Sequence, residues 1–394
     1  MNTQALPKLL YLGDVPVEPT VAGAALLHRL LQGYPTDRLM VVQSEHPDRE
    51  PVPLPGVRYA TYRLPLQKLT RTRLHRWAGI LRYLTAARQV TAIGSLAADF
   101  NPEAVLTVVA GYTWITAAAF ARKQNLPLHL ITHDDVSGTL ALPSRMHDSL
   151  SKTFAAICRQ AVNRFCISPQ MAEAYSLPDA PASVLYPSRS AELVPFVRPV
   201  EVARRPGSIH FGYAGSIHSP GYVRLLANLA EVIGPMGGRL VLFAGPNPPP
   251  SLLALANVES RGFVANSQLL QALRESVDVL FLPMSFDQGD RRNMELSFPS
   301  KLTDYTAACL PLLICGPAYC SAARWARDHP GVAELVESED RAPLEAAVLR
   351  LAIDRAYRDK LAIQASIIGE VMFSHESVAA RFLDAVRSHA GAAQ

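Results

Sequence analysis

The sequence predicts an α/β protein made of two parallel-sheet domains. Short apolar runs alternate with amphipathic stretches in both halves of the chain, which is typical of βα units. A length of 394 residues is enough for two domains that each bury a core. Between the halves, residues 188–207 contain several prolines and charges without a clear period, which indicates a linker.

The first half, residues 1–187, is predicted to form one Rossmann-like domain. Each expected strand is an apolar run bounded by polar or turn residues, and the expected helices repeat apolar residues every three or four positions. The strands are expected at residues 8–13, 39–43, 105–109, 128–132, 165–168 and 182–186. The helices are expected at residues 21–31, 73–100, 113–124, 144–162 and 169–175.

The second half, residues 208–373, repeats this pattern, and residues 374–394 are predicted to form a terminal helix that packs back on the N-terminal domain. Ligands of such sheets bind outside the carboxyl ends of the strands, so we expect the functional residues there. The strands are expected at residues 208–213, 240–244, 258–260, 279–282 and 312–315. The helices are expected at residues 222–233, 266–276, 301–308, 321–329, 342–351 and 355–372.

The composition predicts a globular, cytoplasmic protein. Hydrophobic residues make up 49% of the chain and charged residues 18%, which excludes a disordered chain. A net charge of +4 is too small to predict a nucleic-acid partner. The five cysteines contain no CxxC pair and are expected to be reduced core residues. The apolar run at residues 9–12 is too short for a signal peptide, and residues 105–120 fall short of a bilayer span.

Residues 297–305, Ser-Phe-Pro-Ser-Lys-Leu-Thr-Asp-Tyr, lead from a polar loop into a helix. Ser297 or Ser300 is predicted to cap this helix, whose free amide groups suit a phosphate. Lys301 places a positive charge where the helix dipole prefers acids, which indicates a nearby anion. Asp304, one turn later, is a candidate ligand for a ribose diol. For each of these residues alone, an ordinary surface helix is the alternative.

This string continues into small residues, Pro311 and an apolar strand, and it resembles the donor-site segment of GT-B glycosyltransferases. The resemblance is greatest to the retaining family 4, the glycogen-synthase-like group, and it extends along most of the chain. It implies a GT-B fold, in which two Rossmann-like βαβ domains face each other across a cleft. It also implies that a sugar moves from a nucleotide-sugar donor to an acceptor hydroxyl, with retention and without a metal.

The resemblance assigns the donor to the C-terminal domain. Gly215 and Ser216 match a loop that lies beside the diphosphate in relatives, and the glycine allows a close backbone approach. No GxGxxG is present there, which disfavours an oxidoreductase or epimerase. The basic residue usual after this loop is missing, so Lys301 is expected to neutralise the diphosphate, with Arg224 or residues 291–292 as helpers. Residues 263–264 match the segment that meets the nucleobase, with core packing of Phe263 as the alternative.

Relatives commonly have two glutamates separated by seven residues, and Asp304 stands at the second position. Either Glu295 fills the first position after a one-residue slip, or that role is missing. Together with Lys301 and His133, Glu295 completes the expected catalytic set. The resemblance therefore leaves open a catalytically silent GT-B protein that acts as a binding or assembly subunit.

In the N-terminal domain, His133, Asp134 and Asp135 follow an expected strand. Three interpretations compete: His133 contacts the donor sugar, as a histidine does in relatives; the two aspartates bind a divalent metal; or they cap a turn. The resemblance favours the first, and it places Asp134 on the acceptor side. Gly23 matches a glycine of the acceptor-side loop.

Residues 71–88 combine basic side chains with apolar ones at helical spacing. A solvated surface helix is one interpretation. The other is a peripheral contact with an anionic membrane surface that carries a lipid-linked acceptor. The expected partners are thus a nucleotide-sugar donor and a sugar, lipid-linked or protein acceptor. The expected location is the cytoplasm, at the inner face of the membrane if residues 71–88 bind it.

Overall fold

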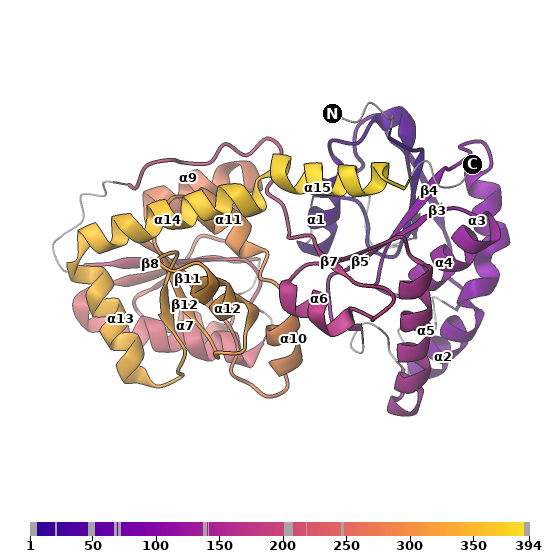
Figure 1. The fold of residues 1–394 in the computed structure, drawn as a ribbon. Coiled ribbons are helices and arrows are strands. Elements are labelled where there is room, and N and C mark those ends of the chain that lie inside the picture. The colour runs from indigo at the N-terminus through magenta and orange to yellow at the C-terminus, as the bar shows by residue number, and fades with distance from the viewer. Residues whose placement is uncertain are drawn as a thin grey trace. The chain divides into compact units, whose positions relative to one another are not determined.

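The computed structural model describes residues 6–19, 22–45, 52–66, 69, 72–136, 140, 142–200, 208–217, 219–245 and 248–389. The chain divides into two compact units (Figure 1). The first unit comprises Met1–Ala191 and Val378–Gln394, and the second comprises Glu192–Ser377. Each unit is an α/β domain built on its own parallel sheet. None of the helices in the described part of the chain is long and apolar enough to span a bilayer.

The sheet of the first unit has seven parallel strands in the order β3-β2-β1-β4-β5-β6-β7. The order reverses between β1 and β4, and ligands bind at such reversal points in open α/β sheets. The strands are β1 (Leu9–Gly13), β2 (Leu39–Ser44), β3 (Arg58–Tyr62), β4 (Ala104–Val108), β5 (Leu128–Thr132), β6 (Asn163–Cys166) and β7 (Ser183–Val184).

Helices cover both faces of this sheet, so the side chains on both faces of its central strands are buried. Leu9 and Tyr11 of β1 belong to one core cluster and Leu10 to the other, as the alternation of side chains along a strand requires. Phe382 of the C-terminal helix is fully buried in the first of these clusters. The helices are α1 (Ala22–Leu31), α2 (His75–Thr85), α3 (Val90–Ala97), α4 (Thr113–Lys123), α5 (His147–Gln160), α6 (Pro169–Tyr175) and, from Val378 on, α15 (His375–Arg387).

The sheet of the second unit has six parallel strands in the order β10-β9-β8-β11-β12-β13. Its order reverses between β8 and β11. The strands are β8 (His210–Ala214), β9 (Arg239–Phe243), β10 (Val258–Ser260), β11 (Val279–Pro283), β12 (Leu312–Cys315) and β13 (Glu334–Val336).

Helices α9, α11 and α14 lie on one side of this sheet, and α7 and α13 lie on the other (Figure 1). The core between sheet and helices is formed by buried residues such as Phe211, Leu229 and Phe281. The helices are α7 (Pro220–Ile233), α8 (Pro250–Leu253), α9 (Asn266–Ser276), α10 (Arg291–Leu296), α11 (Lys301–Ala307), α12 (Ser321–Asp328), α13 (Arg341–Ile353) and α14 (Arg355–Phe373).

Several elements differ from the sequence prediction. Residues 73–100 form α2, a 3-10 turn at Ala86–Gln89 and α3 instead of one helix. The hydroxyl of Thr85 donates to the carbonyl of Leu81 at 2.7 Å, and such back-bonding often bends a helix. The edge strands β3 and β13 and the short helices α8 and α10 were not predicted, because they are too short or too polar to produce a clear period.

Candidate functional site

Gly215 lies directly after β8, at the reversal point of the second sheet. Its φ angle is +123°, which a residue with a side chain rarely adopts. A Cβ at this position would lie 2.5 Å from Cε of Lys301. The backbone conformation therefore favours glycine, and the missing side chain leaves room for the end of the Lys301 side chain.

Lys301 is the first residue of α11 and approaches this loop from the other side of the reversal point. Its Nζ lies 5.1 Å from the ring centre of Tyr213 and 5.8 Å from that of Tyr222. Burial lowers the pKa of Lys301 from 10.5 to about 8. Removal of the ammonium group from water therefore favours its neutral form, and a bound anion would counter that effect.

Two tyrosines fix the loop that faces Lys301. The hydroxyl of Tyr305, which is 1% exposed, accepts a hydrogen bond from the backbone N–H of Ala214 at 2.7 Å. The hydroxyl of Tyr213 donates to the carbonyl of Ser216 at 2.5 Å. Since Tyr305 belongs to α11, its bond ties this helix to the end of β8. No role was predicted for Tyr305, although it ends the string that contains Lys301.

Neither predicted serine caps α11. Ser300 has a helical φ of −56° and makes no capping bond, and the hydroxyl of Ser297 donates to Oδ1 of Asn293 at 2.6 Å. The cap prediction is therefore wrong, and α11 has only seven residues. The positive charge here comes from Lys301 more than from the helix. Asp304 lies one turn further on and is half-buried.

Arg224 of α7 already has two acidic partners. Its Nη2 lies 2.7 Å from Oδ1 of Asp287 and 2.9 Å from Oε1 of Glu339. Hydrogen bonds to Asp287 and then to Glu339 raise the pKa of Arg224 above its ordinary value. Asp287 lies in the loop after β11, so this ion pair joins that loop to α7, the helix that follows β8.

The other expected donor-site residues are spread over the second unit. Phe263 is 74% exposed, so it does not pack in the core, and Val264 beside it is half-buried. Glu295 of α10 lies with its Oε1 3.6 Å from Nη2 of Arg324. This ion pair joins α10 to α12.

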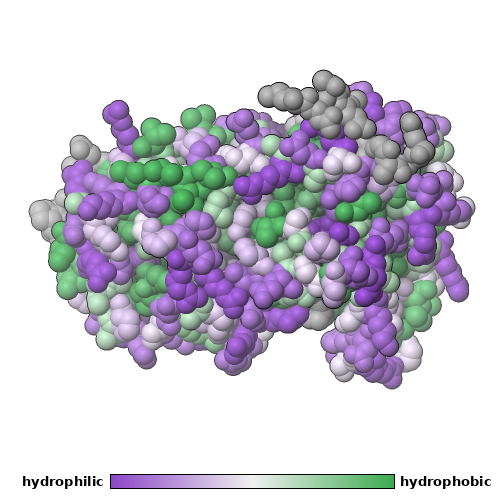
Figure 2. All heavy atoms as spheres, in the orientation of Figure 1, coloured by the Kyte–Doolittle hydropathy of each residue, from purple (hydrophilic) through white to green (hydrophobic). Residues whose placement is uncertain are grey.

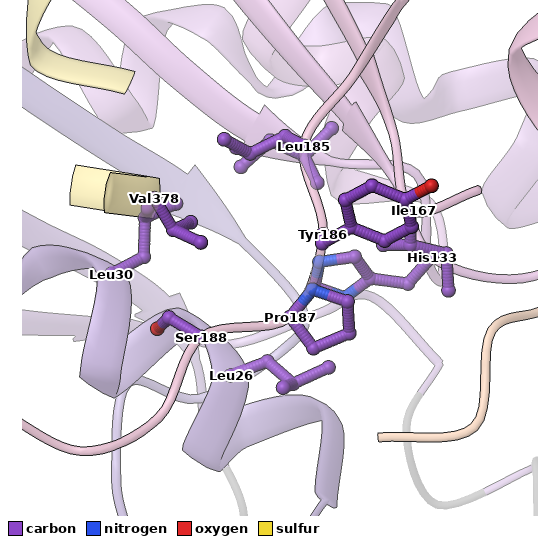
Figure 3. A pocket seen from close by; sticks show the side chains of 10 residues that line it. Leu26, Leu30, His133, Ile167, Leu185, Tyr186, Pro187, Ser188 and Val378 are labelled. Carbon is purple, nitrogen blue, oxygen red and sulfur yellow. The ribbon is translucent and has the colours of Figure 1, made fainter. Parts of the chain in front are cut away.

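In the first unit, His133 follows β5 and lines a small cavity (Figure 3). Burial lowers its pKa from 6.5 to about 4, so the imidazole is neutral at physiological pH. The cavity is otherwise mainly apolar, with His133 beside Tyr186 and Pro187 in Figure 3. The remaining lining residues are Leu26, Leu30, Ile131, Ile167, Leu185, Ser188 and Val378.

The neighbours of His133 have separate surroundings. Asp134 is exposed, whereas Oδ1 of Asp135 accepts from the hydroxyl of Tyr175 at 2.5 Å. Among the described residues, no group of three or more His, Cys, Asp or Glu side chains could hold a metal ion. Gly23 lies on α1, and no heavy atom lies within 4 Å of the point where its Cβ would be. Gly23 therefore leaves open space on this helix.

Asp14, for which no role was predicted, lies directly after β1. Its Oδ2 accepts from the backbone N–H groups of Tyr112 at 2.6 Å and Thr113 at 2.9 Å. Its Oδ1 accepts from the hydroxyl of Thr113 at 2.5 Å. The carboxylate thus bonds the first turn of α4, at the reversal point between β1 and β4. An aspartate directly after an apolar strand was the available signal.

No protein-family model matches the chain, and no curated protein matches it. Solved structures do match. HepE from Anabaena in complex with UDP has a TM-score of 0.67 at 14% identity, over 96% of this chain and 99% of that one. The chain has the GT-B fold. The predicted fold class is therefore confirmed.

Other GT-B structures match over the same length. Sucrose-phosphate synthase from Thermosynechococcus elongatus has a TM-score of 0.66 at 16% identity, over 96% of this chain and 98% of that one. The lipopolysaccharide outer core galactosyltransferase WaaB has a TM-score of 0.64 at 17% identity, over 96% and 99%. At identities this low, the structural similarity shows the GT-B fold and not the reaction.

Proposed function

We propose that the chain is a retaining glycosyltransferase that moves a sugar from a nucleotide-sugar donor to an acceptor hydroxyl. The observation that carries this proposal is the position of Lys301 across Gly215, at the reversal point of the second sheet of a GT-B fold. A cation beside a glycine, whose backbone no side chain covers, suits a diphosphate. In support, HepE has been solved both with UDP and with UDP-glucose.

In this proposal, the donor diphosphate lies against the backbone of residues 215–216 and the ammonium group of Lys301. The bond between the anomeric carbon and the phosphate oxygen breaks, and a bond from that carbon to the acceptor oxygen forms on the same face. The proton of the acceptor hydroxyl passes to the leaving phosphate oxygen. Lys301 stabilises the negative charge that develops there, and loss of one such donor typically costs about 2.7–4 kcal/mol.

The remaining roles are those that the sequence resemblance implies. Asp304, one turn after Lys301, is assigned to the ribose, and the exposed Phe263 with Val264 to the base. His133, held neutral, is suited to hydrogen-bond the donor sugar, while Gly23 and Asp134 are assigned to the acceptor. The product would be a polysaccharide, glycolipid or other glycoconjugate. Arg224 and Glu295 have acidic and basic partners of their own, so the proposal does not rest on them.

The ion pairs that Arg224 and Glu295 form within the second unit also support a second candidate. This is a GT-B subunit that binds a nucleotide sugar without turning it over. A panel of UDP, GDP, ADP, CMP and dTDP sugars tests both. Thermal unfolding identifies the donor, because a ligand at one hundred times its Kd stabilises the folded state by about 2.7 kcal/mol. Hydrolysis of that donor in the absence of acceptor then separates enzyme from silent subunit. If no sugar nucleotide shifts the unfolding temperature, both candidates fail.

A further inference from the structure

Helix α2 of the first unit has apolar side chains on its solvent face. Leu74, directly before α2, and Trp77, Leu81 and Leu84 within it are 51%, 66%, 48% and 60% exposed. Their spacing of three, four and three residues places them on one side of the helix. The buried residues of this helix are Ala78, Gly79, Arg82 and Tyr83. A surface helix normally carries polar residues on the side away from the core, so α2 departs from that pattern.

The sequence that contains this apolar stripe is strongly basic. Between Pro51 and Ala98 the chain contains eight arginines and lysines and no aspartate or glutamate, although the whole chain has a net charge of only +4. Arg73 and Arg76 of this segment, next to Trp77, are exposed, and so is Arg88 beyond the end of α2. Arg58 and Arg63 pair with Asp99 and Glu45, which lie just outside the segment. Arg73 and Arg76 therefore place the positive charge beside the exposed apolar side chains.

We propose that α2 docks the first unit on an anionic lipid surface. A helix that exposes tryptophan and leucine beside arginine is typical of helices that lie in the plane of a membrane interface. In this arrangement Trp77 and the three leucines enter the boundary between headgroups and acyl chains. Arg73 and Arg76 contact lipid phosphates. The segment itself adds no acidic side chain that an anionic surface would repel.

The proposal does not depend on the glycosyltransferase activity, so it is tested by binding alone. The full chain is sedimented with vesicles of phosphatidylcholine, with and without phosphatidylglycerol. We expect binding to the anionic vesicles at low salt, a loss of at least tenfold at high salt, and little binding to the neutral vesicles. If the full chain stays in the supernatant with anionic vesicles at low salt, the proposal is wrong.

Trp77 also provides a direct signal. The chain has three tryptophans, and Trp114 and Trp325 are only 0% and 3% exposed. A blue shift of the emission on addition of anionic vesicles, absent from the Trp77→Phe variant although that variant still sediments, would place Trp77 at the interface. An unshifted emission of vesicle-bound wild type would contradict the assigned face.

Paired variants control for non-specific hydrophobic adsorption to the vesicles. Leu81→Ser with Leu84→Ser should reduce vesicle binding at least tenfold while the unfolding temperature shows that the fold persists. The matched control is Ile363→Ser with Ile367→Ser on α14, where Figure 2 shows apolar side chains gathered and these two are 43% and 53% exposed. Equal losses in both pairs, or binding of Arg73→Glu with Arg76→Glu as tight as wild type, would overturn the proposal. So would a preference for single-stranded nucleic acid over the anionic vesicles.

Discussion

The side chain of Lys301 crosses the backbone of Gly215, with Cε 2.5 Å from the point where a Cβ on residue 215 would lie. The two residues are 86 positions apart in the sequence and meet because β8 and α11 flank the reversal point of the second sheet. A cation and a bare stretch of backbone together suit a phosphate better than either does alone. This pair is the basis of the first two predictions.

Lys301→Ala should leave the protein folded but reduce both donor affinity and turnover. If the ammonium group stabilises the leaving diphosphate, the loss of about 2.7–4 kcal/mol corresponds to a fall of about 100- to 1000-fold in kcat. Steady-state kinetics with the donor identified by the panel provides the measurement. Lys360→Ala, which removes an exposed lysine of α14, is the matched control and should behave as wild type. Unchanged kinetics of Lys301→Ala would show that its charge is only solvated.

Donor binding should weaken as the pH rises through 8. The pKa of Lys301 is lowered to about 8 by burial, so the free protein loses this positive charge above that value. If only the protonated form binds the diphosphate, the Kd should rise about tenfold between about pH 7 and 9. Calorimetric titration at several pH values measures this. Lys301→Arg keeps its charge over that range, so its Kd should be flat, and an equally flat wild type would contradict the assignment.

The sequence predicted the fold more completely than the site. Apolar runs such as residues 128–132 and 279–282 revealed most central strands, because strands buried on both faces are almost continuously hydrophobic. The string around Lys301 identified one side of the reversal point. The contact with Gly215 and the bond from Ala214 to Tyr305 were not predictable, because both depend on how α11 packs against β8.

The partners of charged residues also could not be predicted from the sequence. Arg224 was expected to help a diphosphate, and only the fold shows Asp287 and Glu339 at 2.7 and 2.9 Å from its guanidinium group. Asp14 bonds the start of α4, a helix 99 positions away, for which no local pattern exists. Long-range ion pairs and caps of this kind require the tertiary structure.

Activity should survive chelation of divalent metals. The proposed mechanism uses the ammonium group of Lys301 in place of a divalent metal ion to stabilise the leaving diphosphate. Transfer assays with excess EDTA, followed by addition of Mg²⁺ or Mn²⁺, provide the measurement. Activity lost with EDTA and restored by either ion would refute metal independence while leaving the fold assignment intact.

Tyr305→Phe should destabilise the second unit. The hydroxyl of Tyr305 accepts from the buried N–H of Ala214, and the variant leaves that donor unsatisfied. Such a loss costs about 1–3 kcal/mol in the free energy of unfolding, which denaturant titration measures. Tyr319→Phe is the matched control, because the structure gives its buried hydroxyl no hydrogen-bond partner among the described residues. Equal stabilities of the two variants would show that the bond to Ala214 contributes little.

Asp304 provides the sharpest test of the donor site. It lies one turn after Lys301, so both side chains leave the same face of α11. A carboxylate that accepts from two ribose hydroxyls makes charge-assisted hydrogen bonds worth about 1.5–3 kcal/mol each. Asp304→Asn keeps the size and loses the charge, so the donor Kd should rise at least tenfold.

Asp304→Glu keeps the charge and introduces the glutamate of the family that the sequence resembles, so it should bind the donor at least nearly as well as wild type. The ribose assignment predicts this opposite behaviour of the two variants, because Asn matches the length of Asp and Glu matches its charge. Calorimetry on wild type and both variants decides between charge and length. Three identical Kd values would show that α11 does not bind the ribose, whatever the role of Lys301.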